Sequence, residues 1–177
     1  MSYTQLWILV EGNDDERLIQ HVKPEFEVLY DHVGIWKYAK ATKKTVAEFL
    51  RVMNSAPSVD CIYLADINNS PCITAKREGI KNKYGNRIEI ERIVIAVQEI
   101  ESWYLAGLDE QDSKELGIKP LNGTDDITKE KFSDMTPARF DSRIDYMPEI
   151  LKRFSVETGV AKNASFGYFM RKAGCDV

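Results

Sequence analysis

The clearest strand signal in the chain is Asp60-Cys-Ile-Tyr-Leu-Ala65, which runs directly into Asp66-Ile-Asn-Asn-Ser70-Pro71. A short apolar run bounded by turn-forming residues is typical of a buried central strand. Ser70 as the N-cap and Pro71 at the first helical position then predict a helix just after the turn. The segment therefore predicts a strand, a loop that opens with the carboxylate of Asp66, and a helix.

The N-terminal stretch follows the same plan. Gln5–Val10 is a second short apolar run and stops before Gly12, which is typical of a buried strand. Asn13, with Glu16 three residues later, is a capping-box pattern and predicts the start of a helix. The apolar stripe of that helix continues as far as Pro24. This region therefore also predicts a strand followed by a helix.

Further elements continue the alternation up to Trp103. Thr42 or Thr45 is placed to cap a helix that Pro57 ends. Other predicted strands are Phe26–Tyr30 and Gly34–Tyr38, as one or two elements, and Arg87–Val97. Alternating strands and helices indicate a mostly parallel sheet with right-handed crossovers.

The fold class that these elements predict is α/β, with a Rossmann-like, mostly parallel sheet flanked by helices. Beyond Trp103 the sequence becomes more polar and is interrupted by Gly and Pro, with helical stripes at Pro148–Val156 and Ser165–Ala173. We therefore expect a core over residues 1–106 and a helical C-terminal extension over residues 107–177 that packs on it. With 177 residues the chain can bury such a core without disulfide or metal staples.

Cysteine usage and hydropathy indicate the cellular compartment in which the protein is expected. The chain has three cysteines and no CxxC pair, and Cys61 lies within the central apolar run. We therefore expect a reducing compartment, the cytoplasm, rather than a disulfide framework or a zinc site. The N-terminus has no basic region before its short apolar run, and no apolar stretch approaches the roughly 18 residues of a membrane span. Neither a signal peptide nor a membrane partner is expected.

Net charge alone makes no general case for nucleic-acid binding, because the chain carries −4. The charge is unevenly spread, however, since residues 37–92 contain eleven Lys or Arg against six Asp or Glu. A locally basic face on an acidic protein can attract a polyanion. It can equally be the solvated side of two helices, and the sequence leaves both interpretations open.

Acidic or amide residues follow three predicted strands at the points where the strands end. They are Glu11 with Asp15, Asp66 with Asn68, and Glu99 with Glu101. Parallel strands bring these ends to one edge of the sheet, where ligands of such folds bind. Carboxylates gathered there repel one another unless a cation with oxygen ligands neutralises them. The pattern therefore predicts a site for Mg²⁺ or Mn²⁺.

The chain resembles TOPRIM domains, found in topoisomerases, primases and the OLD family of nucleases, at Val10-Glu11-Gly12 and at Leu64-Ala-Asp66-Ile-Asn68. The spacing of Glu11 and Asp15 is similar to the OLD-type variant, in which a second acidic residue joins the first metal site. Further segments resemble an uncharacterised bacterial and archaeal TOPRIM-related family, namely Glu99-Ile-Glu-Ser-Trp-Tyr-Leu-Ala106, Ser165-Phe166 and Lys40–Lys44. The resemblance covers most of the chain.

The resemblance implies a Mg²⁺- or Mn²⁺-dependent, nuclease-like protein that hydrolyses DNA or RNA with a metal-activated water. The implied metal ligands are Glu11, Asp15, Asp66, Asn68, Glu99 and Glu101. Glu11 and Asp66 are also expected to be catalytic, with Lys43 and Lys44 holding backbone phosphates. One departure stands out, because Asn68 takes the place of the second Asp in the family's Asp-x-Asp motif and removes one negative charge.

Other interpretations of the same residues stay open. Asp15 lies in a first helical turn, where acids favour the helix dipole, and Lys43 and Lys44 can equally belong to a solvated loop. Asn68 and the acidic net charge favour a catalytically silent TOPRIM scaffold that regulates or binds a partner protein. A third hypothesis is a phosphatase or nucleotidyl-transfer enzyme for a small phosphorylated substrate. Trp103 is expected to pack in the core rather than to stack on a base.

Overall fold

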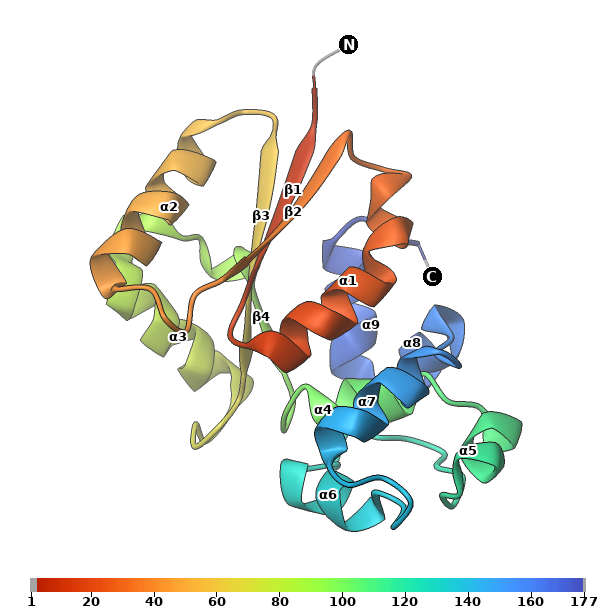
Figure 1. Ribbon diagram of the computed structural model, residues 1–177. Coiled ribbons are helices and arrows are strands. Elements are labelled where there is room, and N and C mark those ends of the chain that lie inside the picture. Colours follow the sequence, from red (N-terminus) through yellow and green to blue (C-terminus); the bar gives the residue numbers. More distant parts are fainter. Residues whose placement is uncertain (1–2, 177) are drawn as a thin grey trace.

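The chain folds around a four-stranded sheet, and the computed structural model describes residues 3–176 (Figure 1). Strands and helices alternate in the order β1 (Gln5–Val10), α1 (Asn13–Glu27), β2 (His32–Lys37), α2 (Lys43–Ser55), β3 (Val59–Asp66), α3 (Ile73–Tyr84) and β4 (Ile93–Ala96). Two 3₁₀ turns, η1 (Gly85–Arg87) and η2 (Ile90–Arg92), precede β4. The helices that follow are α4 (Glu101–Ala106), α5 (Glu110–Leu116), α6 (Lys129–Met135), α7 (Arg143–Leu151), α8 (Val156–Lys162) and α9 (Ala164–Lys172).

Every strand pair in the sheet is parallel, and the strand order is β2-β1-β3-β4. In β1, Gln5 lies opposite His32 of β2 on one side and opposite Val59 of β3 on the other. Helices α1 and α9 cover one face of the sheet, while α2 and α3 cover the other (Figure 1). The predicted α/β class is therefore confirmed, with a parallel sheet flanked by helices and a C-terminal helical region.

Alternating side chains along the central strands divide the core in two. In β1, Leu6 and Ile8 belong to the core on the α1 side, whereas Leu9 belongs to the core on the side of α2 and α3. In β3, Leu64 and Tyr63 are divided in the same way. Successive strand residues point to opposite faces, so a strand that is covered on both faces is apolar at nearly every position. This explains the unbroken apolar runs of β1 and β3.

The direction in which the chain leaves its strands reverses between β1 and β3. From β1 the chain passes through α1 to β2, and from β3 it passes through α3 to β4 on the opposite side (Figure 1). The two loops diverge, and open α/β sheets bind ligands in the crevice outside the strand ends at such a point. Asp66 is the last residue of β3, and Glu11 directly follows β1. Both residues therefore lie where the topology favours a binding site.

The predicted strand at Phe26–Tyr30 is wrong, because α1 continues past Pro24 and includes Phe26. Phe26 lies four residues after Val22 on the buried stripe of the helix and packs edge-on against Phe169, with ring centroids 5.7 Å apart. Burying this aromatic ring offsets part of the roughly 3 kcal/mol that a proline inside a helix costs. Tertiary packing therefore extends the helix beyond its sequence signal.

Two other predicted elements begin at different residues in the structure. Helix α3 is capped by Cys72 instead of Ser70, since Cys72 Sγ accepts a backbone N–H hydrogen bond at 3.5 Å. The predicted strand at Arg87–Val97 is reduced to the four residues of β4, because 3₁₀ turns occupy its first half. The start of α2 is as predicted, and Thr42 caps it by accepting from the N–H of Thr45.

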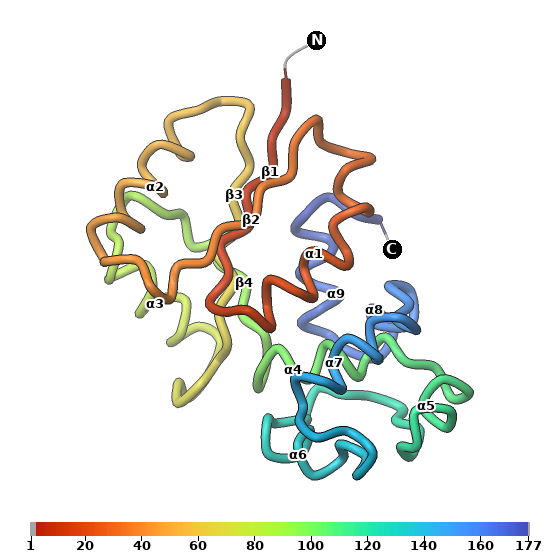
Figure 2. Tube along the Cα trace, in the orientation of Figure 1, coloured from red at the N-terminus to blue at the C-terminus, as the bar shows by residue number. Residues whose placement is uncertain are grey.

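The C-terminal helices share the core on the α1 side of the sheet. Figure 2 shows the chain passing through α4 to α8 beyond the carboxyl ends of the strands and then returning along the sheet in α9. Phe166, Phe169 and Met170 of α9 are buried in the same cluster as Leu6 of β1. Trp103 is fully buried there as well, as predicted. The helical extension is therefore packed on the sheet through a common core.

A buried hydrogen-bond network joins α9 to the end of β4. The hydroxyl of Ser165 accepts from the indole N–H of Trp103 at 2.8 Å and from the backbone N–H of Val97 at 3.2 Å. The same hydroxyl donates to Asn163 Oδ1 at 2.8 Å, and the Asn163 amide donates to Ser102 Oγ. The two motifs around Trp103 and Ser165, far apart in the sequence, therefore meet in space.

Replacing Ser165 with Ala is expected to lower the free energy of unfolding by about 2–4 kcal/mol. The N–H groups of Trp103 and Val97 would each lose an acceptor, and an unsatisfied buried donor costs about 1–3 kcal/mol. Urea unfolding followed by tryptophan fluorescence measures the change. Ser133→Ala, at an exposed position of α6, is the matched control and should cost less than about 0.5 kcal/mol. Equal effects of the two substitutions would contradict the role given to the network.

Candidate functional site

The carboxyl ends of β1, β3 and β4 bring acidic side chains to one edge of the sheet. The cluster consists of Glu11, Asp15, Asp66, Glu99 and Glu101. Asp66 lies at its centre, because the negative charges of the other four all act on this carboxyl and raise its pKa. Four of the other five predicted metal ligands therefore lie near enough to Asp66 for their charges to act on it.

Asp66 combines a partly exposed position with a buried oxygen atom. Its Oδ1 atom is buried and has no hydrogen-bond partner among residues 3–176. Burial raises the pKa of Asp66 to about 8, and the neighbouring carboxylates, first Asp15 and then Glu101, contribute to the rise. Its charged form is therefore costly at neutral pH unless a cation compensates it.

Asp15 has a structural role through one of its two oxygens. Asp15 Oδ2 accepts a hydrogen bond at 3.1 Å from the N–H of Gly12, the N-cap residue of α1. The predicted cap at Asn13 is therefore wrong by one residue, and Asp15 takes the part of the capping-box acid that was assigned to Glu16. The alternative role for Asp15 at the helix start thus has direct support from the structure.

The second oxygen of Asp15 is not used by the cap. Asp15 is 6% exposed, and its Oδ1 atom is buried without a partner in the described part of the chain. Burial raises the pKa of Asp15 to about 6, the N–H of Gly12 opposes this rise, and the charges of Glu11 and Glu101 add to it. Asp15 therefore both caps α1 and offers an unpaired oxygen to the cluster.

Glu101 is already paired with a cation of the chain. The guanidinium of Arg143, at the start of α7, donates from Nη1 to Glu101 Oε1 at 2.5 Å and to Asp14 Oδ2 at 2.9 Å. Burial still raises the pKa of Glu101, although the charge of Arg143 lowers it. Arg143 thus joins the C-terminal helices to α1 and α4, a functional contact that no sequence pattern singled out.

The other predicted ligands lie at the rim of the cluster. Glu99 Oε2 accepts a hydrogen bond at 2.6 Å from the N–H of Lys129, the first residue of α6. Asn68 is exposed, has a left-handed backbone with φ of +48°, and donates from its amide to the backbone oxygen of Asp66 at 3.5 Å. Glu11 is exposed as well. Glu99 is therefore held by a helix, whereas Glu11 and Asn68 face solvent.

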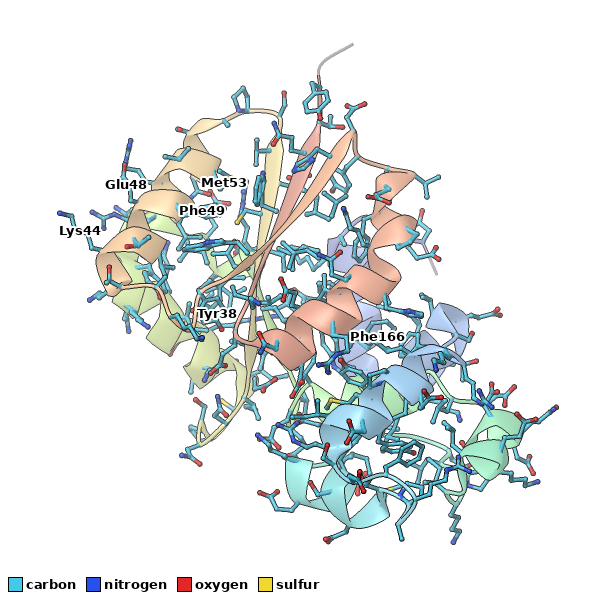
Figure 3. The ribbon with its side chains drawn as sticks, in the orientation of Figure 1. Tyr38, Lys44, Glu48, Phe49, Met53 and Phe166 are labelled. Carbon is cyan, nitrogen blue, oxygen red and sulfur yellow. The ribbon has the colours of Figure 1, made fainter. Side chains whose placement is uncertain are left out.

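Neither Lys43 nor Lys44 lines the hollow that Glu11 and Asn68 border beside the acidic edge. Lys44 lines a separate hollow with Trp36 and Phe49 on the outer side of α2, and Figure 3 shows it pointing away from the part of the sheet where Tyr38 lies. Lys43 is exposed at the first position of α2. The predicted phosphate-binding role of this pair therefore stays a prediction.

Two lysines that the sequence did not single out lie closer to the acidic edge. A hollow of about 350 Å³ between α3 and the strand ends is lined by Glu11, Asn68, Lys76 and Lys83, among others. Lys76 and Lys83 are seven residues apart and therefore lie on the same face of α3. That spacing, in the helix that follows the Asp66 loop, was the available sequence signal.

The arrangement of the carboxylates bears on which metal fits them. Among residues 3–176, no group of three or more His, Cys, Asp or Glu side chains is arranged to hold a metal ion. Mg²⁺ does not need such a group, because it usually keeps several waters and binds one or two carboxylates. The unpartnered oxygens of Asp15 and Asp66 fit that chemistry, since a carboxylate oxygen can only accept. The residues present therefore fit Mg²⁺ or Mn²⁺ with a largely aqueous shell.

The fold and its edge define the class of the chain as an open, parallel α/β protein with an acidic strand-end site. Comparisons with protein-family models, with curated proteins and with solved structures found no match. The TOPRIM resemblance therefore stays a prediction. None of the helices within residues 3–176 has the length and apolar character needed to cross a membrane.

Metal-free protein is expected to lose stability as the pH rises. The folded-state pKa values of Asp15 and Asp66, about 6 and about 8, lie above the ordinary value of 3.8. Protonation of these groups therefore stabilises the fold fully below about pH 4, and this contribution is lost as the pH rises through 6 and then 8. Asp66→Asn, which removes the charge, should raise the free energy of unfolding at about pH 8 by about 2 kcal/mol and by less at pH 5.

Thermal unfolding in EDTA across this pH range measures the effect. Asp141→Asn, at an exposed position before α7, removes an equal charge outside the cluster and should leave the melting temperature nearly unchanged. If Asp66→Asn lowers the melting temperature at pH 8, the carboxylate of Asp66 is satisfied within the protein and the description of the cluster is wrong.

Proposed function

We propose that the acidic edge of the sheet binds Mg²⁺ or Mn²⁺ and that the protein acts on phosphodiester bonds of DNA or RNA as a nuclease-like enzyme. The place of the cluster, where the chain leaves β1 and β3 in opposite directions, supports a ligand site. The resemblance of the motifs around Glu11 and Asp66 to TOPRIM domains supports the choice of chemistry.

One observation carries the proposal. Asp15 and Asp66 each bury a carboxylate oxygen that has no partner among residues 3–176. Their other contacts fix them in place, Asp15 through the N–H of Gly12 and Asp66 as the last residue of a paired strand. Burying unpaired charges costs several kcal/mol each. A cation bound at the edge would remove this cost, and oxygen ligands are those that Mg²⁺ and Mn²⁺ prefer.

The residues of the edge have distinct tasks in this proposal. Asp15 and Asp66, with Glu11 at the exposed side, would hold the cation, and the bound ion would polarise a phosphodiester oxygen and lower the pKa of a coordinated water. Arg143 fixes Glu101 beside them and limits the repulsion that its charge causes. Glu99 keeps the start of α6 against the site.

The proposed setting is the cytoplasm. Cys61, Cys72 and Cys175 are free thiols, and Cys61 is buried within the core on the side of α2 and α3. Unpaired cysteines suit a reducing compartment, where thiols are not oxidised to disulfides.

A catalytically silent scaffold that binds a partner protein is the second candidate, and Arg143 favours it. Its guanidinium already compensates Glu101 and Asp14, and Asn68 brings no charge to the loop. Less negative charge is therefore left for a metal ion than an Asp-x-Asp site would offer. In that case the edge would be stabilised by its internal cation and would serve recognition alone.

Incubation with DNA and RNA distinguishes the two candidates. With Mn²⁺, wild-type protein should cleave linear single-stranded or duplex substrates, and Asp66→Ala should reduce the rate at least about 100-fold, since metal stabilisation of the reacting phosphate contributes several kcal/mol. Asp141→Ala should retain the wild-type rate. Intact substrates under all conditions, combined with a melting temperature that Mn²⁺ leaves unchanged, would favour the scaffold.

Restoring the missing charge at Asn68 is expected to strengthen metal binding. Asn68→Asp adds a carboxylate ligand, and Asp tolerates the left-handed backbone of this position. Calorimetric titration should show Mn²⁺ binding tightened about tenfold, a gain of one charge-assisted contact. Asn69→Asp adds the same charge one residue later and should have a smaller effect. Unchanged affinity of Asn68→Asp would exclude this side chain as a ligand.

A further inference from the structure

The hollow beside the acidic edge joins opposite charges from two elements. Glu11 comes from the loop after β1, while Lys76 and Lys83 come from α3, and all three line the same space of about 350 Å³. The charge of Glu11 also acts on Asp66, so the hollow adjoins the carboxylate cluster. A ligand in this space would therefore meet the proposed metal edge on one side and two cations on the other.

The two lysines are available to a ligand. Neither Lys76 nor Lys83 forms an ion pair with a carboxylate in the part of the chain that the structure describes. The ammonium group of Lys83 lies 5.1 Å from the ring centroid of Tyr84, a contact that leaves its hydrogen-bond donors free. Asn68 and Ser70 add neutral polar groups to the lining. An anion that suits both lysines and a metal-bound edge is a phosphate group.

The lining of the hollow also includes a glycine of α3 and two tyrosines. Gly79, one turn after Ala75 on α3, has nothing within 4 Å of the point where a Cβ would lie. On the sheet side, the rings of Tyr38 and Tyr63 are stacked with centroids 4.5 Å apart, and the hydroxyl of Tyr38 donates to the backbone oxygen of Leu64 at 2.9 Å. The hydrogen bond holds Tyr38 in place on the sheet side, and Gly79 leaves α3 without a side chain at this point of the hollow.

The size of the hollow restricts what can enter it. A volume of about 350 Å³ lies at the lower end of small-molecule sites, which span about 300–1,000 Å³. Such a space admits one nucleoside with its phosphate, and it does not admit a base-paired duplex. Tyrosine rings can contact a base, and the nearby lysines can contact its phosphate.

We infer that this hollow receives a single unpaired nucleotide, with its phosphate between the acidic edge and Lys76 and Lys83, and its nucleoside against Gly79. The ligand is either a free nucleotide or an unpaired nucleotide of a strand, since both present the same chemistry. The inference rests on the proposed function, because the metal edge supplies one side of the phosphate site.

Binding of three probes in the presence of Mn²⁺ tests the inference. The probes are AMP, a short single-stranded DNA with phosphorothioate linkages, and a blunt DNA hairpin of the same linkages. Gly79→Phe fills the hollow from an exposed helix position and should weaken binding of AMP and single-stranded DNA at least about tenfold. The double variant Lys76→Gln, Lys83→Gln should do the same by removing the cations.

Matched control variants distinguish a loss of binding caused at the hollow from a general effect of substitution on binding. Gly79→Ala improves helix propensity by roughly 0.5–1 kcal/mol and leaves the hollow open, so binding should stay within about twofold of wild type. Lys119→Gln removes an exposed charge elsewhere and should likewise leave binding unchanged. Tighter binding of the strand than of AMP identifies a strand as the source of the nucleotide, and equal binding identifies a free nucleotide.

The melting temperature with and without Mn²⁺ distinguishes failure of the proposed metal function from failure of the nucleotide site. No rise in wild type would remove the proposed metal function itself. A rise in all variants, together with unchanged AMP and strand binding by Gly79→Phe and the double lysine variant, would overturn the nucleotide site alone. Absence of binding of either probe by wild-type protein loaded with Mn²⁺, or equal binding of the blunt hairpin, would also overturn it.

Discussion

The parallel sheet forces negative charges together at the carboxyl ends of its central strands. Asp66 closes β3, Glu11 follows β1, and the start of α1 places Asp15 between the strand edge and the core. Asp15 and Asp66 are largely buried, so the charges around them are weakly screened and, together with burial, raise the pKa values of these two carboxyls. Other parts of the molecule reduce this repulsion between carboxylates.

Arg143 is the clearest of these features. It reaches Glu101 and Asp14 from α7, so a helix after β4 supplies the cation that pairs with these two carboxylates. The network of Ser165, Asn163 and Trp103 fixes α4, the helix that carries Glu101, against α9. The C-terminal helices therefore set the charge and the geometry of the site in addition to covering the sheet.

Local patterns predicted the parts of the fold that depend on local chemistry. The runs of β1 and β3 are apolar because both faces are covered, and Thr42 was a correct cap because its hydroxyl meets a free backbone N–H. Phe26–Tyr30 was assigned to a strand because Pro24 normally ends a helix, and only the contact with Phe169 shows why α1 continues. The eleven-residue span of the predicted final strand, on the other hand, overlooked turns that carry no distinctive sequence signal.

The residues of the candidate site also divide into those that local sequence patterns predict and those that only tertiary packing reveals. Glu11 and Asp66 could be selected because a carboxylate after an apolar strand has a defined position in a parallel sheet. Arg143 could not, since it lies 42 residues from Glu101 and 129 from Asp14 and meets them only through tertiary packing. Lys76 and Lys83 were not singled out from the sequence, because the direction in which a helix presents its charges depends on its rotation against the sheet.

The common core on the α1 side has a consequence for how the molecule denatures. Phe26 of α1, Leu6 of β1 and Phe169 of α9 all belong to one apolar cluster, so the change of character near residue 106 is no boundary between independently folding units. A polypeptide cut there would lose α9, one of the two helices that cover the α1 face of the sheet, and the intact chain is built to melt in a single cooperative transition.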